Sequence, residues 1–228
     1  MKRLMVLIVM LSGCVPVNES EENVKVEPLQ APKRDYVLAI PVDISGSFLD
    51  EMFGRHGRGY RFVQMAIDRL FRDRMGTDDH VLLAQLSTGQ PLLWEGSPRD
   101  LKRRFKNADA LKNFIAGHAG GTSHLYAGVA DTLEYLYALP GVRDGETKVC
   151  VLILSDMQDN SPTLEADKTR MIQALRKMKD VKAGIGFYFV DAGELAGTRQ
   201  CMIDAGIDPR FIESGIVENP PLPTFGEP

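Results

Sequence analysis

The sequence predicts an α/β domain with a doubly wound, mostly parallel sheet and one antiparallel edge strand. Nearly continuous apolar runs recur at 36–42, 80–86, 148–154 and 183–190, as in strands buried on both faces of a sheet. Segments with helical spacing of apolar residues separate them, and this alternation is typical of parallel strands joined by right-handed crossovers. With 228 residues, 44% of them apolar, the chain can form one such domain with a full core.

The first strand, 36–42, contains Pro41, which has no amide hydrogen to donate to a neighbouring strand. We therefore expect either that its pairing ends before Pro41 or that one neighbour starts late. Apolar residues at helical spacing predict a helix over 61–74. A second strand at 80–86 then turns into an antiparallel edge strand at 91–94.

The second half of the domain begins with a helix start at Ser97, which is followed by a proline and, three residues on, by Asp100. The basic stretch Leu101–Lys106 continues this helix and is expected to be a solvated helix face. The remaining elements are expected in the order helix 125–139, strand 148–154, a helix starting at 161–162, strand 183–190, helix 195–205 and short strand 211–217.

The N-terminus has the features of an export signal. Lys2 and Arg3 precede an apolar stretch, Leu4–Leu11, that is too short to span a bilayer. The following Leu-Ser-Gly-Cys ends at Cys14 and resembles the lipobox of bacterial lipoproteins, which implies that Cys14 carries fatty acyl chains such as palmitate. Val15 comes next, and the absence of Asp there favours the outer membrane if the source is a diderm bacterium.

The predicted organisation is therefore a signal peptide at 1–13, lipidated Cys14 with a disordered tether to 34, a domain over 35–217 and a Pro-rich C-terminal tail at 218–228. The net charge of -4 comes with no long basic run, so binding to a nucleic-acid backbone is not indicated. An exported protein could join Cys150 and Cys201, but two separate buried thiols fit the sequence as well.

Polar residues follow the first strand at alternate positions. Asp43, Ser45 and Ser47 lie in the stretch DISGS, and a bend at Gly46 would let one carboxylate and two hydroxyls surround a single point. Such hard oxygen ligands suit Mg²⁺, which readily keeps waters or outside ligands in its octahedral shell. Alone, the pattern is also that of an ordinary turn at the end of a strand.

Two later positions are expected at the same edge of the sheet. Thr122 follows Gly121 at a helix start, and Asp156 follows strand 148–154. Ligand sites of open parallel sheets form at the carboxyl ends of strands. The order and spacing of these residues resemble the von Willebrand factor type A domain, whose metal-ion-dependent adhesion site combines a DxSxS loop, a later Gly-Thr and an Asp that ends a strand. The resemblance covers about 36–217.

The resemblance implies a Rossmann-like sheet and a metal site for Mg²⁺, with Mn²⁺ or Ca²⁺ as alternatives. The implied metal-site residues are Asp43, Ser45, Ser47, Thr122 and Asp156. In the family the serines ligate directly, the threonine directly or through water, and the aspartates directly or through bridging waters. An Asp or Glu of a partner protein typically completes the coordination, which neutral hydroxyl ligands favour because they leave the cation's charge largely unneutralised.

These observations predict a lipid-anchored, exported adhesion or scaffold module that captures a partner carboxylate through a divalent cation, and not an enzyme. One alternative is a subtilisin-like serine protease that uses Asp43, His56 and Ser123, although His56 follows Asp43 within one loop. Another is a von Willebrand-like scaffold whose metal site is not used, with the same residues serving only as caps and turns.

Overall fold

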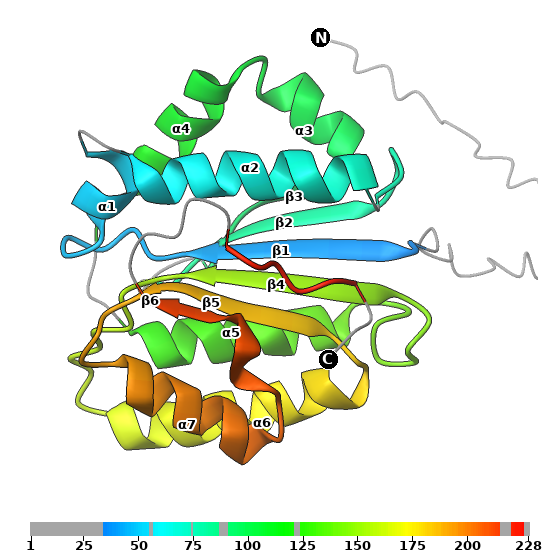
Figure 1. Ribbon diagram of the computed structural model, residues 1–228. Helices are drawn as coiled ribbons and strands as arrows, with labels where there is room; N and C mark the ends of the chain where they lie inside the picture. The colour runs from blue at the N-terminus through cyan, green and yellow to red at the C-terminus, as the bar shows by residue number, and fades with distance from the viewer. Residues whose placement is uncertain are drawn as a thin grey trace, which may run out of the picture. The chain divides into compact units, whose positions relative to one another are not determined.

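The computed structural model describes residues 34–54, 57–73, 75–86, 91–120, 124–214 and 220–225. Six strands form one sheet in the order β3-β2-β1-β4-β5-β6 (Figure 1). Their bounds are β1 Tyr36–Val42, β2 His80–Gln85, β3 Leu92–Gly96, β4 Lys148–Leu154, β5 Gly184–Val190 and β6 Ile212–Ser214. Only the pairing of β2 with β3 is antiparallel. The predicted fold class, with its antiparallel edge strand, is confirmed.

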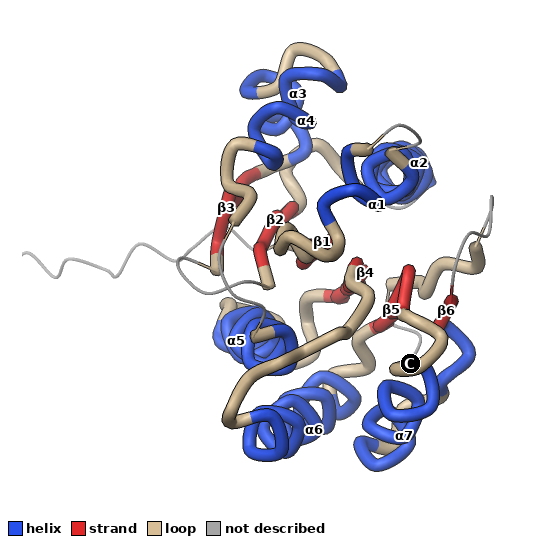
Figure 2. Tube along the Cα trace, turned by 90° about the vertical axis from the view of Figure 1, so that its left-hand side faces the viewer, coloured by secondary structure: helices blue, strands red, loops and turns tan. Residues whose placement is uncertain are grey.

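Helices cover both faces of the sheet (Figure 2). They are α1 Leu49–Phe53, α2 Arg58–Asp73, α3 Pro98–Arg104, α4 Ala108–Ala116, α5 Leu125–Ala138, α6 Leu164–Asp180, α7 Leu195–Ala205 and the 3-10 helix η1 Pro209–Phe211. Because side chains alternate along a strand, Val37 and Ala39 pack beneath α5 to α7, whereas Leu38 and Ile40 pack beneath α1 to α4. In the described part of the chain, no helix is both long and apolar enough to cross a membrane.

Pro41 lies in β1, at the centre of the sheet, and interrupts the pairing on one side only. The ladder with β2 runs through it and pairs Pro41 with Ala84. The ladder with β4 passes from Ala39 to Val42. Asp43, two positions after Pro41, donates its amide to β4 at 2.8 Å, so position 41 faces the same way. Pro41 therefore lacks its amide hydrogen on the side that faces β4, where the ladder is interrupted.

Several helix bounds differ from the sequence expectation. Helix α2 begins at Arg58, three residues before the predicted start, and α6 begins at Leu164 because Ser161 opens a turn in which its carbonyl accepts from the Leu164 amide at 3.3 Å. Helices α1 and α4 were not predicted. The start of α4 has a recognisable signal, since the Asn107 Oδ1 accepts from the Ala110 amide at 2.8 Å as an N-cap. Helix α1 has only five residues and no side-chain cap.

Residues 220–225, within the predicted C-terminal tail, lie against the sheet. Leu222 and Phe225 are buried in the core beneath α2. The segment passes so close to β5 that a Cβ added at Gly184 would lie 2.3 Å from the Thr224 carbonyl oxygen. This close approach requires glycine at position 184 and makes the segment part of the packed domain.

Cys150 and Cys201 are free thiols. Cys150, on β4, lies in the core beneath α2, and Cys201, on α7, lies in the core on the opposite face of the sheet. Burial raises the pKa of both thiols. The alternative of two separate buried cysteines is therefore the one that the structure shows.

Candidate metal centre

The candidate site lies at the carboxyl ends of β1 and β4, the two central strands. From β1 the chain continues outward to β2, and from β4 it continues outward to β5 on the other side, so this is a topological switch point. Figure 1 shows the arrowheads of β1, β4 and β5 pointing to the same edge, where α1 begins. Asp43 follows β1 directly, and Ser155 and Asp156 follow β4. The Asp43 amide donates to the Leu154 carbonyl at 2.8 Å, which ties the two loops together.

The loop after β1 is held by two apolar anchors. Ile44 and Phe48 are buried, and the Phe48 ring contacts that of Phe189 edge-on, with centroids 6.0 Å apart. The amide of Phe48 donates to the Ser45 carbonyl at 3.2 Å, forming the turn into α1. This arrangement buries Ser45 and leaves Ser47 exposed at the surface. The two predicted hydroxyl ligands thus differ in environment.

Asp43 is fully buried, and each of its carboxylate oxygens accepts one hydrogen bond. The Ser45 amide donates to Oδ1 at 2.8 Å, and the Ser155 hydroxyl donates to Oδ2 at 3.2 Å. Burial raises the pKa of Asp43; the groups of Ser45 oppose this rise, the nearby charge of Asp156 adds to it and Ser155 opposes it. A bound cation would relieve the desolvation and repulsion that raise this pKa.

The Ser45 hydroxyl tests whether these residues fit a metal ion. Its oxygen is buried close to the Asp43 carboxylate, whose pKa it lowers, and it makes no geometrically defined hydrogen bond to the residues described. An unsatisfied buried hydroxyl is unfavourable by about 1–3 kcal/mol, and a cation at this point would satisfy it. Within the described ranges, no group of three or more His, Cys, Asp or Glu side chains gathers. The carboxylates of Asp43 and Asp156 and the serine hydroxyls are hard oxygen donors, the ligand type that Mg²⁺ and Mn²⁺ prefer.

The loop after β4 carries local strain. Met157 is buried with φ 60°, in the left-handed region that non-glycine residues rarely adopt. Its amide donates to the Ser155 hydroxyl at 2.8 Å, and the neighbouring Asp156 carbonyl accepts from the Asp191 amide at 2.9 Å. The Asp156 side chain is half-buried and accepts from the Gln158 amide at 2.9 Å. These bonds fix the direction in which Asp156 leaves the strand.

Asp159 joins this loop to the start of α5, a role that the sequence did not reveal. Its Oδ1 accepts from the Ser161 amide at 2.7 Å, which is the local turn expected of such a residue. Its Oδ2 accepts from the Tyr126 amide at 3.1 Å, at the first turn of α5. His124, the N-cap residue of α5, provides no side-chain cap, so Asp159 supplies that cap from a distant loop.

The structure brings Asp43, Ser45 and Asp156 to one edge of the sheet, with Ser47 in the same loop. Thr122 lies outside the described residues, as do Cys14 and the two other members of the protease alternative, His56 and Ser123. Gly120, the last described residue before Thr122, contacts the loop after β1, because its amide donates to the Ile44 carbonyl at 3.2 Å. Ser155 and Asp159, which hold the site together, were not among the predicted metal-site residues. Ser155 could have been found from the sequence, because it stands beside Asp156. Asp159 could not, because the amide that it caps belongs to Tyr126, 33 residues away.

No protein-family model matches the sequence. No curated protein matches it either. Solved structures do match. The pilus adhesin SpaC of Lactobacillus rhamnosus GG, in its open conformation, has 13% identity and a TM-score of 0.54, over 82% of this chain and 28% of SpaC. The manganese-loaded TRAP protein of Plasmodium vivax has 16% identity and a TM-score of 0.50, over 80% of this chain and 68% of TRAP.

A von Willebrand factor type A protein from Catenulispora acidiphila is matched at 16% identity over 75% of this chain and 42% of that one, with a TM-score of 0.42. The chain spans less than a third of SpaC and less than half of the Catenulispora protein, so it corresponds to one part of these longer chains. Its strand order and its likeness to SpaC and TRAP show that the described chain has a doubly wound α/β fold, which is the fold that the resemblance to the von Willebrand factor type A domain implied.

Proposed function

We propose that this protein is a metal-dependent protein-binding module that captures a carboxylate of a partner through a divalent cation. The residues proposed to hold the cation are Asp43, Ser45, Ser47, Thr122 and Asp156. One observation carries the proposal: the buried Ser45 hydroxyl lacks a hydrogen-bond partner in the described chain and lies beside the buried Asp43 carboxylate.

The chemistry of the residues supports recognition rather than catalysis. A bound divalent cation supplies a positive charge and open coordination positions for oxygen ligands. Hydroxyl ligands neutralise little of that charge, so an incoming Asp or Glu side chain is favoured. Mg²⁺ is the proposed ion, with Mn²⁺ or Ca²⁺ as alternatives, and the manganese-loaded state of TRAP supports such a choice.

We further propose that the module is not an enzyme and that it is exported and anchored to a membrane through acyl chains on Cys14. In a diderm bacterium the anchor is proposed to reside in the outer membrane. SpaC, which shares the fold, is a pilus adhesin, and this supports a role outside the cytoplasm in binding another protein.

Isothermal titration of the full chain with Mg²⁺ and Mn²⁺ tests the proposal. We expect saturable binding that Asp43→Ala and Ser47→Ala weaken at least about tenfold, which corresponds to about 1.4 kcal/mol. Ser214→Ala serves as the matched control, because Ser214 is also exposed but lies on edge strand β6. Curves that do not differ between the wild type and the two site variants would refute the metal-dependent function and favour the scaffold alternative.

A further inference from the structure

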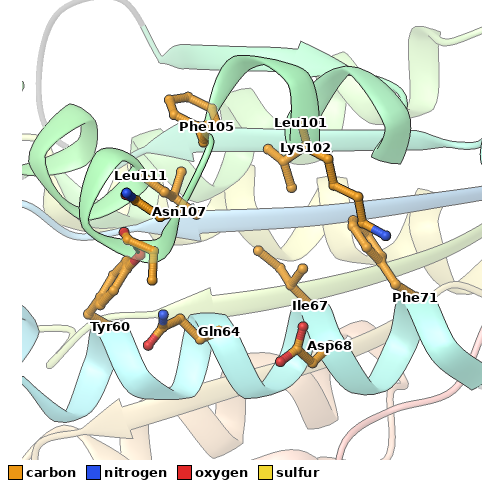
Figure 3. A pocket seen from close by; sticks show the side chains of 11 residues that line it. Tyr60, Gln64, Ile67, Asp68, Phe71, Leu101, Lys102, Phe105, Asn107 and Leu111 are labelled. Carbon is orange, nitrogen blue, oxygen red and sulfur yellow. Dashed lines mark hydrogen bonds between the residues drawn. The ribbon is translucent and has the colours of Figure 1, made fainter.

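A groove separate from the metal centre runs between α2 and the pair α3–α4. Figure 3 shows side chains from both sides facing each other across it. Tyr60, Gln64, Ile67, Asp68 and Phe71 form the α2 wall. Their spacing places them on one stripe of the helix, and the twelve-residue span from Tyr60 to Phe71 is about 16 Å long. The cavity has a volume of about 300 Å³, enough for one or two large side chains.

The opposite wall is apolar and rigidly held. Leu101 and Leu111 are buried at its base, and Phe105 is half-buried between the two helices. The Phe105 ring contacts Phe114 and Trp94, with centroids 5.0 and 6.1 Å away. These contacts fix the aromatic wall before any ligand arrives, which lowers the entropy lost on binding.

Three hydrogen bonds order the helices that line the groove, and one of them joins its two walls. The Ser97 hydroxyl caps α3 by accepting from the Asp100 amide at 3.1 Å, and Asn107 caps α4. The Tyr60 hydroxyl donates to the Ala108 carbonyl and so ties α2 to the start of α4. The groove is therefore a preformed feature of this layer.

The polar side chains at the rim are available to a ligand. Gln64, Asp68 and Lys102 line the groove, and within the described chain none of them makes a side-chain hydrogen bond or an ion pair. The Gln64 amide and the Lys102 ammonium group can both donate to a carboxylate or a peptide carbonyl, and the Asp68 carboxylate can accept from a peptide amide. The rim thus offers two donors and one acceptor beside an apolar floor.

The charge of this layer is opposite to that of the chain. The four helices of this layer, α1 to α4, have a net charge of +3 in a chain of net charge -4: α2 contributes +2 and α3 +3, α1 contributes -2 through Asp50 and Glu51, and α4 is neutral. All four basic residues of α3 are exposed. Such a local excess raises the encounter rate with an acidic partner and disfavours a basic one.

We propose that this groove binds an acidic peptide segment of a partner protein, which inserts a bulky apolar side chain between Ile67 and Leu101 and places a carboxylate near Lys102. The contact needs no metal ion and goes beyond the proposed function. It would give the partner a second point of attachment on the face covered by α2.

The test is fluorescence anisotropy of the labelled peptide Glu-Glu-Trp-Leu-Glu-Glu with the full chain in EDTA. We expect saturable binding that weakens at least tenfold for the Lys102→Glu variant and is lost for Gln64→Trp, whose ring fills the groove. Arg143→Glu is the matched control, because it makes the same change in charge at an exposed position outside the groove and is expected to leave the affinity unchanged. Circular dichroism of each variant verifies that it is folded.

Four results of the assay in EDTA would overturn the proposal. They are no saturation up to about 1 mM peptide, equal binding of the Lys-for-Glu peptide, equal binding of a peptide with Ala in place of Trp and Leu, and unchanged affinity in both groove variants. Binding that requires Mg²⁺ would also overturn it, because the peptide would then be captured at the metal centre. Since the assay contains EDTA, failure of the metal proposal and failure of the groove proposal are distinguishable.

Discussion

The substitution Ser45→Ala gives the sharpest test of the metal centre, because its effect on stability should depend on whether the cation is present. Without metal, the buried Ser45 hydroxyl has no hydrogen-bond partner among the described residues. An unsatisfied buried polar group costs about 1–3 kcal/mol, and alanine removes it while leaving almost no cavity. We expect the variant to be more stable than the wild type in EDTA by about 1 kcal/mol, or by about 2–4 °C in Tm for a domain of 150–250 residues.

With metal bound, Ser45→Ala should no longer be more stable than the wild type. At a magnesium concentration one hundred times the Kd, binding stabilises the wild type by about 2.7 kcal/mol. If loss of the Ser45 ligand weakens binding tenfold, the variant gains about 1.4 kcal/mol less. The magnesium-induced rise in Tm of the variant should then be about half that of the wild type. The higher stability that the variant has in EDTA should therefore be lost at this magnesium concentration.

Thermal unfolding followed by circular dichroism, in EDTA and in a magnesium series, measures both quantities. Ser214→Ala is again the control, since its exposed hydroxyl should matter in neither condition. A Ser45→Ala variant that is clearly destabilised in EDTA would mean that the hydroxyl already has a partner. An unchanged magnesium-induced shift would mean that Ser45 does not ligate the ion. Either result refutes the reasoning.

Three further predictions concern the site and the anchor. Burial raises the pKa of Asp43, so the folded, metal-free protein favours the neutral carboxyl. The resulting stabilisation is complete below the pKa of Asp43 in the unfolded chain and is lost as pH rises through its raised pKa in the folded protein. In EDTA, pH-dependent unfolding curves should show this loss for the wild type and not for Asp43→Asn. Asp159→Ala should remove the cap on the Tyr126 amide and lower the unfolding free energy by about 1 kcal/mol in denaturant titrations, whereas exposed Asp144→Ala should not. Metabolic labelling should add fatty acid to the wild type but not to Cys14→Ser, and undiminished label would exclude the lipid anchor.

The sheet could be read from the sequence because its strands are continuous apolar runs. The run over Lys148–Leu154 coincides with β4 and has no competing helical period. The apolar stripe of α2 likewise predicted this helix, but not its first turn. That turn contains Arg58, which is held by a bidentate ion pair with Glu51. Helix α1 was not predictable, because five residues contain too little periodicity to distinguish a helix from a loop.

The ligand types of the site could be predicted, but the bonds that orient them could not. Asp43, Ser45, Ser47 and Asp156 stand in the sequence at strand ends, where polar residues are conspicuous. In contrast, the orienting bond from Ser155 to Asp43 joins residues 112 positions apart. Such pairing depends on which strands become neighbours, and periodicity carries no information about that.

The loop after β4 organises the whole site, and its strain follows from that role. Ser155 donates to Asp43, the Asp156 carbonyl accepts from the loop after β5, and Asp159 caps α5. Each bond holds a different neighbouring segment, and Met157 lies between them with a backbone conformation that costs about 1–2 kcal/mol. The conformation persists because its neighbours are fixed on both sides. We therefore expect loss of the Ser155 hydroxyl to disturb Asp43 directly, whereas glycine at position 157 would relieve the backbone strain at the larger cost of the buried Met157 side chain.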